Sequence, residues 1–161
     1  MQFKREYLEK WLEELARRGY DTVIWEVENN IRWTTCPQCA SPDAFSKEEF
    51  AQILASCGEL GLESIPLLQV IAHCEYVLRH DEYGHLSETP GEIRQYCPQN
   101  AELLPFLTKW IAEYLELFGD VKFFHLGADE AWWMGSCEKC AAFVAENSLS
   151  KLYIDHINAV A

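Results

Sequence analysis

Positively charged residues are scarce in this chain. Lys and Arg number 13 against 26 Asp and Glu, so the 161 residues carry a formal net charge of −13. A surface that binds nucleic acid or an anionic membrane needs clustered Lys and Arg to neutralise phosphates. The composition therefore argues against both kinds of partner and favours an uncharged ligand.

Long apolar runs are absent as well. No stretch of the sequence approaches the roughly 20 consecutive apolar residues of a membrane-spanning helix. The first residues carry charges where a signal peptide would have its apolar core. With 49% hydrophobic and 13% aromatic residues, the chain can still bury the core of one globular domain. We therefore expect a cytoplasmic protein without a membrane segment.

Cysteine, by contrast, is abundant. Four of the seven cysteines form two C-x-x-C pairs, Cys36 with Cys39 and Cys137 with Cys140. This is the ligand spacing of structural zinc sites, so one zinc ion held by all four thiolates is one interpretation. Free or redox-active thiols and disulfides are the other two. A chain this rich in apolar residues does not need a disulfide framework to fold, which favours a reducing compartment.

The spacing of apolar residues predicts helices in four parts of the chain. They cover residues 3–18, the residues that follow Ser46, residues 102–118 and most of residues 137–161. Ser46 and Glu49 form the capping box that begins the second helix. The apolar stripe of the first helix includes Phe3, Tyr7 and Trp11.

Short apolar or β-branched runs predict strands between these helices. They cover residues 22–27, 65–71 and 122–126, with Pro66 at the start of the second strand. Long loops follow the strands, among them the polar stretch 72–100. This order is typical of parallel β-α-β units and of (β/α) barrels, although a closed barrel needs eight strands.

Two neighbouring carboxylates follow the third predicted strand. The chain leaves this strand at Gly127 and then presents Asp129 and Glu130. Acids this close together cannot easily share one ionisation state, so one tends to keep its proton near neutral pH. A proton donor beside a charge stabiliser suits the cleavage of a glycosidic bond. The alternative interpretation is a simple helix N-cap.

Three segments resemble one enzyme family. Residues 125–130, His-Leu-Gly-Ala-Asp-Glu, are similar to a signature of family 20 glycoside hydrolases, the β-N-acetylhexosaminidases. Residues 25–29 and 69–78 resemble the segments at the second and third barrel strands of the hexosaminidase D-like branch, with Ala72 in place of the usual glycine. The resemblance implies a fragment of a (β/α)8 TIM barrel, roughly its second to fourth β-α units. Residues 1–161 would then form one partial catalytic domain, inactive by itself.

The resemblance also implies a mechanism in which the acetamido group of the substrate attacks the anomeric carbon. Glu130 would be the general acid and base, and Asp129 would hold the acetamido nitrogen and stabilise the intermediate. The substrate would be a glycan with a terminal N-acetylglucosamine or N-acetylgalactosamine, and catalysis would need no cofactor. The residues expected to contact the sugar are His73, His125, Glu28, Glu75 and Trp132.

Several of these residues also have a purely structural interpretation. His125 could be a core imidazole, and Trp132 and Trp133 could pack at the barrel mouth instead of stacking on a sugar. Two other functions are compatible with the sequence: a barrel glycosidase with a carboxylate nucleophile, and a non-catalytic module that binds carbohydrate or another protein.

Overall fold

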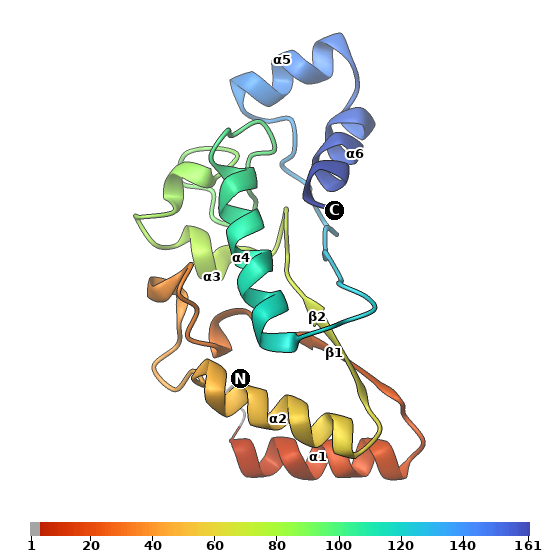
Figure 1. Ribbon diagram of the computed structural model, residues 1–161. Helices are drawn as coiled ribbons and strands as arrows, with labels where there is room; N and C mark the ends of the chain where they lie inside the picture. The colour runs from red at the N-terminus through yellow and green to blue at the C-terminus, as the bar shows by residue number, and fades with distance from the viewer. Residues whose placement is uncertain (1–3) are drawn as a thin grey trace. The chain divides into compact units, whose positions relative to one another are not determined.

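The computed structural model describes residues 4–161 (Figure 1). These residues form two compact units. The first unit combines the residues up to Leu67 with Glu113–His125. The second unit combines Leu68–Ala112 with Leu126–Ala161. Helix α4, Leu103–Phe118, contributes residues to both. No helix among residues 4–161 is long and apolar enough to cross a membrane.

The first unit is built around a β-α-β crossover. Strands β1, Thr22–Glu26, and β2, Glu63–Leu67, pair in parallel from Thr22↔Glu63 to Glu26↔Leu67. Helix α2, Lys47–Glu59, connects them and begins at Ser46 with both hydrogen bonds of the predicted capping box. Two short 3-10 helices, η1 (Glu28–Asn30) and η2 (Pro37–Cys39), lie in the loop after β1. The predicted strand 22–27 and the helix after Ser46 are confirmed.

Helix α1, Arg5–Arg17, confirms the first predicted helix, but its apolar stripe is placed differently. Leu12 is the buried residue of α1, whereas Tyr7 and Trp11 are 63% and 64% exposed. Phe3, expected in the same stripe, lies outside the described residues. The fold therefore buries Leu12 and leaves the two aromatic residues of the predicted stripe largely in solvent.

The predicted third strand, residues 122–126, is wrong. Within residues 4–161 the sheet has two strands, and the 122–126 segment contributes one parallel bridge, Leu67↔His125. There the His125 amide donates to the Pro66 carbonyl at 2.9 Å. The amide nitrogen and carbonyl of one residue face the same side of a strand, so Pro66 turns its missing donor toward this segment and limits the pairing.

The bounds of the second predicted strand also need correction. The prediction placed it at 65–71 with Pro66 at its start, but β2 begins at Glu63 and ends at Leu67, with Pro66 fourth of five residues. Residues 68–71 are buried without belonging to a strand. Apolar character alone therefore did not distinguish strand from buried irregular chain.

The polar stretch 72–100 is not an open loop. Short helices α3 (Glu75–Leu78) and η3 (Gly84–Leu86) interrupt it. The antiparallel bridges Ala72↔Gln95 and Ser87↔Tyr96 fold it back on itself, and Gln95 and Tyr96 are fully buried. The second unit is completed by α5 (Glu138–Glu146) and α6 (Leu149–Val160), which confirm the predicted helical tail.

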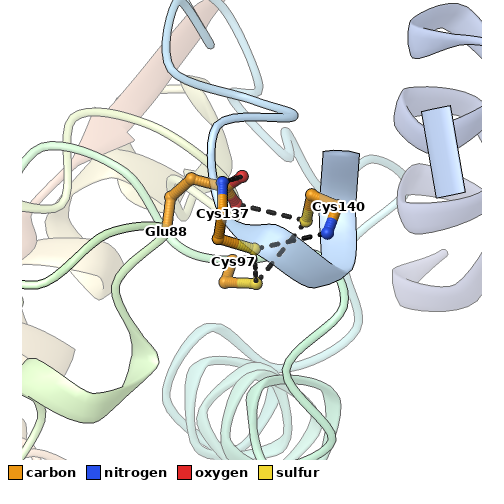
Figure 2. A group of neighbouring side chains, drawn as sticks. All are labelled: Glu88, Cys97, Cys137 and Cys140. Carbon is orange, nitrogen blue, oxygen red and sulfur yellow. Dashed lines mark hydrogen bonds between the residues drawn. The ribbon is translucent and has the colours of Figure 1, made fainter. Parts of the chain in front are cut away.

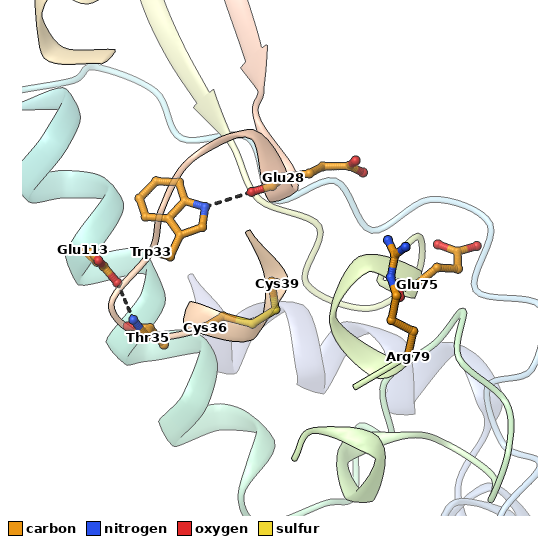
Figure 3. Close-up of a disulfide and its surroundings, with 8 residues drawn as sticks. All are labelled: Glu28, Trp33, Thr35, Cys36, Cys39, Glu75, Arg79 and Glu113. Atoms are coloured by element: carbon orange, nitrogen blue, oxygen red, sulfur yellow. Dashed lines mark hydrogen bonds between the residues drawn. A yellow bond between two sulfur atoms is a disulfide. The ribbon is translucent and has the colours of Figure 1, made fainter. Parts of the chain in front are cut away.

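A buried carboxylate organises part of the first unit. Glu113 on α4 accepts hydrogen bonds from the backbone amides of Thr34 and Thr35 at 2.6 and 2.9 Å and from the Lys47 ammonium at 2.9 Å. Figure 3 shows the bond from Thr35. Burial alone would raise the pKa of Glu113, but these three donors lower it to about 2. Beside it, the Trp33 ring stacks on Tyr114 with centroids 4.2 Å apart. The loop after β1 is therefore tied to α4 by charge as well as by packing.

Candidate active site

The acid pair follows a turn with unusual backbone angles. Gly127, Ala128 and Glu130 all have positive φ, at 64°, 72° and 54°. Positive φ costs non-glycine residues about 1–3 kcal/mol each and persists only where the surroundings impose it. Such residues gather at functional sites, so the turn is a candidate for one.

Gln69 imposes the shape of this turn. Its side-chain oxygen accepts a hydrogen bond from the Ala128 amide at 3.3 Å, and a Cβ on Gly127 would overlap that same oxygen. On α6, the Tyr153 hydroxyl donates to the Ala128 carbonyl at 3.0 Å. Gln69 is 5% exposed. The turn is therefore held from both sides by buried or half-buried polar groups.

The turn brings both carboxylates to one imidazole. The His73 Nε2 atom lies 3.5 Å from Asp129 Oδ2 and 3.4 Å from Glu130 Oε2. His73 itself has a φ of 55°, so its backbone is also held in the left-handed region. The two carboxylates thus converge from neighbouring positions instead of pointing to opposite sides of the chain.

A pocket of about 270 Å³ opens beside this group in the second unit. Its walls are formed by Ala72, His73, Glu75, Arg94, Glu130, Trp132 and Trp133. The pocket is lined by two carboxylates, an imidazole, a guanidinium and two indole side chains. Apolar faces combined with a few convergent polar groups are typical of small-molecule sites.

Arg94 and Trp133 form one wall of the pocket. The Arg94 guanidinium lies 3.8 Å from the centroid of the Trp133 ring, and the Trp133 amide donates to Gln95 Oε1 at 3.0 Å. Glu92 accepts from Arg94 Nε at 2.8 Å. This bond lowers the pKa of Glu92 to about 2 and raises the pKa of Arg94, so both groups stay charged across the physiological range.

The structure brings together five of the predicted site residues. Asp129, Glu130, His73, Glu75 and Trp132 all belong to the second unit, and all but Asp129 line the pocket. Asp129 joins them through His73, and Trp132 lies at the rim with 75% of its surface exposed.

The other two predicted contacts belong to the first unit. His125 is exposed, and its amide is engaged with Pro66. Glu28 has a φ of 43°, and its carbonyl accepts a hydrogen bond from the Trp33 indole at 2.8 Å (Figure 3).

Sequence reasoning missed the roles of Gln69, Arg94 and Tyr153. Gln69 had a detectable signal, because it is the one polar residue in the apolar run 65–71. Arg94 and Tyr153 stand in a polar stretch and on an amphipathic helix, where such residues are ordinary. Their roles depend on contacts with distant parts of the chain, which no local pattern encodes.

The predicted zinc ligand set needs correction. Cys36 and Cys39 are bonded to each other as a disulfide within the first unit, so neither offers a thiolate to a metal (Figure 3). Cys137 and Cys140 lie in the second unit and have different partners, Glu88 and Cys97 (Figure 2). The set of Cys36, Cys39, Cys137 and Cys140 is therefore not formed.

Comparison with curated proteins finds two close relatives in sequence. The chain is 34% identical over 120 residues to hexosaminidase D of Bos taurus and 35% identical over 120 residues to that of Homo sapiens. Each match covers 73% of this chain, but only 35% of the bovine and 25% of the human protein. The chain thus spans about a quarter to a third of these relatives. No protein-family model matches it.

Comparison with solved structures identifies the fold. A β-N-acetylhexosaminidase of Bacteroides fragilis matches with a TM-score of 0.79 at 17% identity, over 96% of this chain and 35% of that one. A chitobiase of Flavobacterium johnsoniae matches at 0.78 and 19%, over 94% and 27%. An exo-β-N-acetylglucosaminidase of Vibrio harveyi, solved with N-acetylglucosamine, matches at 0.75 and 18%, over 93% and 30%. At these identities the likeness establishes the fold, part of a TIM barrel.

Proposed function

Because this chain is a hexosaminidase D-like segment of a family 20 glycoside hydrolase barrel, we propose that the protein containing it removes terminal N-acetylhexosamine from glycans. The observation that carries the proposal is the convergence of Asp129 and Glu130 on His73 beside the pocket. The proposed reaction is retaining and substrate-assisted, so the acetamido oxygen of the sugar acts as the nucleophile.

Glu130 is the proposed general acid and base. It lines the pocket directly, where its carboxyl can reach the oxygen of a glycosidic bond. It would first protonate the leaving oxygen and then remove a proton from the water that opens the oxazolinium intermediate. A positioned acid or base of this kind contributes roughly 10²–10⁴-fold to a rate.

Asp129 is the proposed partner of the acetamido group. A carboxylate at this position can accept a hydrogen bond from the acetamido N–H and stabilise the positive charge that forms on the intermediate. His73 lies between the two acids, and its Nε2 can donate to either of them. His73 is therefore assigned a positioning role for both.

The sugar contacts are proposed from the lining of the pocket. The indoles of Trp132 and Trp133 line the pocket and can pack against a sugar, and Glu75 and Arg94 line it with charged groups that can bond to hydroxyls. The bound N-acetylglucosamine of the Vibrio harveyi relative supports a sugar of this class. Contacts from His125 and Glu28 remain expectations of the family resemblance. We expect the 161-residue chain alone to be inactive, since it corresponds to 35% or less of the two relatives.

The test is the hydrolysis of a nitrophenyl N-acetyl-β-glucosaminide by the full-length protein. Glu130→Gln is expected to lower kcat/KM by about 100-fold or more, and Asp129→Asn is expected to be comparably damaging. Glu146→Gln changes an exposed carboxylate on α5 of the same unit and serves as the matched control.

A second substrate separates this proposal from its alternatives. The nitrophenyl β-glucoside lacks the acetamido group, so the protein should not hydrolyse it. Equal turnover of both substrates would indicate a carboxylate nucleophile instead. Calorimetric binding of N-acetylglucosamine without turnover of either substrate would indicate a carbohydrate-binding module.

A further inference from the structure

Three thiols and one carboxylate meet in the second unit, in a group that the proposed reaction does not use. The ligand atoms of Glu88, Cys97, Cys137 and Cys140 all lie within 4.8 Å of one another (Figure 2). Cys97 Sγ is 3.6 Å from both Cys137 Sγ and Cys140 Sγ, and Cys140 Sγ is 3.4 Å from Glu88 Oε2.

These spacings match a tetrahedral metal site. Sulfur atoms at the usual zinc–sulfur distance of about 2.3 Å lie roughly 3.8 Å apart around a tetrahedral centre. A carboxylate oxygen at about 2.0 Å from the metal would lie about 3.5 Å from each sulfur. The three distances in the structure are within a few tenths of an ångström of those values.

Glu88 is oriented as a metal ligand would be. Its side chain is buried, with the residue 1% exposed. One oxygen, Oε1, accepts from the backbone amides of Gly135, Ser136 and Cys137 at 3.0, 2.9 and 3.2 Å, which leaves Oε2 facing the thiols. Among residues 4–161, no Lys, Arg or His side chain forms an ion pair with Glu88. The three amide bonds offset part of the cost of burying this carboxylate, and a metal ion at Oε2 would offset the remainder.

The start of α5 positions Cys137 and Cys140, the C-x-x-C pair of the second unit. Cys137 is the N-cap of this helix, and its Sγ accepts a hydrogen bond from the Cys140 amide at 3.3 Å. Cys97 and Cys140 are almost fully buried, and Leu152, Phe143 and Met134 pack around the group. Such a shell excludes water, as in closed structural sites.

We propose that Glu88, Cys97, Cys137 and Cys140 bind one Zn²⁺ ion as a closed structural site. Binding would release the thiol protons to solvent, and the resulting three thiolates and one carboxylate would complete the tetrahedral set. The ion would join α5 to the 88–97 segment. Trp133 and Arg94, which form one wall of the pocket, lie within six residues of these ligands along the chain. The site would thereby fix that wall.

The first test is the metal content of the full-length protein, purified with a thiol reductant and without chelator. We expect about one zinc per chain by elemental mass spectrometry. Cys97→Ser and Cys140→Ser should lose it, whereas Cys57→Ser, which changes a buried cysteine on α2, should retain it. Glu88→Gln should weaken zinc binding at least about tenfold. Retention of zinc in both Cys97→Ser and Cys140→Ser would overturn the ligand assignment.

A second test uses only the unmodified protein, so it does not depend on whether the variants fold. Cys97, Cys137 and Cys140 should alkylate slowly in the presence of zinc and at least about ten times faster after chelation, since a bound thiolate is not free to react. The alkylation of Cys57 should not change. Equal rates with and without chelator, or a disulfide from Cys97 to Cys137 or Cys140 in peptide mass maps of reductant-purified protein, would overturn the proposal.

Discussion

The side-chain oxygen of Gln69 occupies the space that a Cβ on residue 127 would need. The two residues are 58 positions apart in the sequence, yet the Gln69 side chain leaves no room for a side chain at position 127. Glycine at 127 lets the chain approach Gln69, and Gln69 in turn holds the next amide. The direction of Asp129 and Glu130 follows from this fit, because both carboxylates come directly after the turn.

Gly127→Ala is therefore expected to damage both stability and activity. The substitution adds a clash with Gln69 to the cost of positive φ, and we expect a loss of about 1–3 kcal/mol or more in the free energy of unfolding. Denaturant titration measures this change in the free energy of unfolding. Gly91→Ala is the matched control, because Gly91 has a φ of 81° with nothing within 4 Å of a Cβ. Equal losses for the two variants would contradict a specific fit to Gln69.

His73→Gln tests the positioning of the acid pair. We expect kcat/KM to fall by up to roughly 100-fold, because both carboxylates lose the group between them. The loss should fall mainly on kcat and little on KM, and this separates positioning of the acids from a general loss of structure. His85→Gln removes a similar pair in the same unit, His85 with Glu102 at 3.5 Å, and should leave kcat unchanged. An unaltered kcat in His73→Gln would argue against the role.

Glu113 makes the stability of the first unit depend on pH. Its pKa is about 2 in the folded chain and about 4.3 in an unfolded one. A lowered folded pKa stabilises the protein above the unfolded value, and the contribution, roughly 2–3 kcal/mol, is lost as pH falls from about 5 to 2. Glu113→Gln should flatten the fall in unfolding free energy between pH 5 and pH 3. The exposed Glu116→Gln on the same helix should not.

Local patterns in the sequence determined the helices and the site's central residues. The capping box at Ser46 and Glu49 defines the start of α2, because both hydrogen bonds lie within four residues. The 102–118 helix and the helical tail follow from apolar spacing. The acid pair stood out because two carboxylates directly follow an apolar run.

Only the tertiary structure decided which partners these residues contact. The pairing of segment 122–126 depended on which side of β2 carries the proline nitrogen, and the convergence on His73 depended on Gln69 and Tyr153. The partners of Cys137 and Cys140 proved to be Glu88 and Cys97, from a stretch that reads as a polar loop. Helix propensity and capping act between near neighbours and can be read from a sequence, whereas these contacts join residues 25 or more positions apart and exist only once the chain has folded.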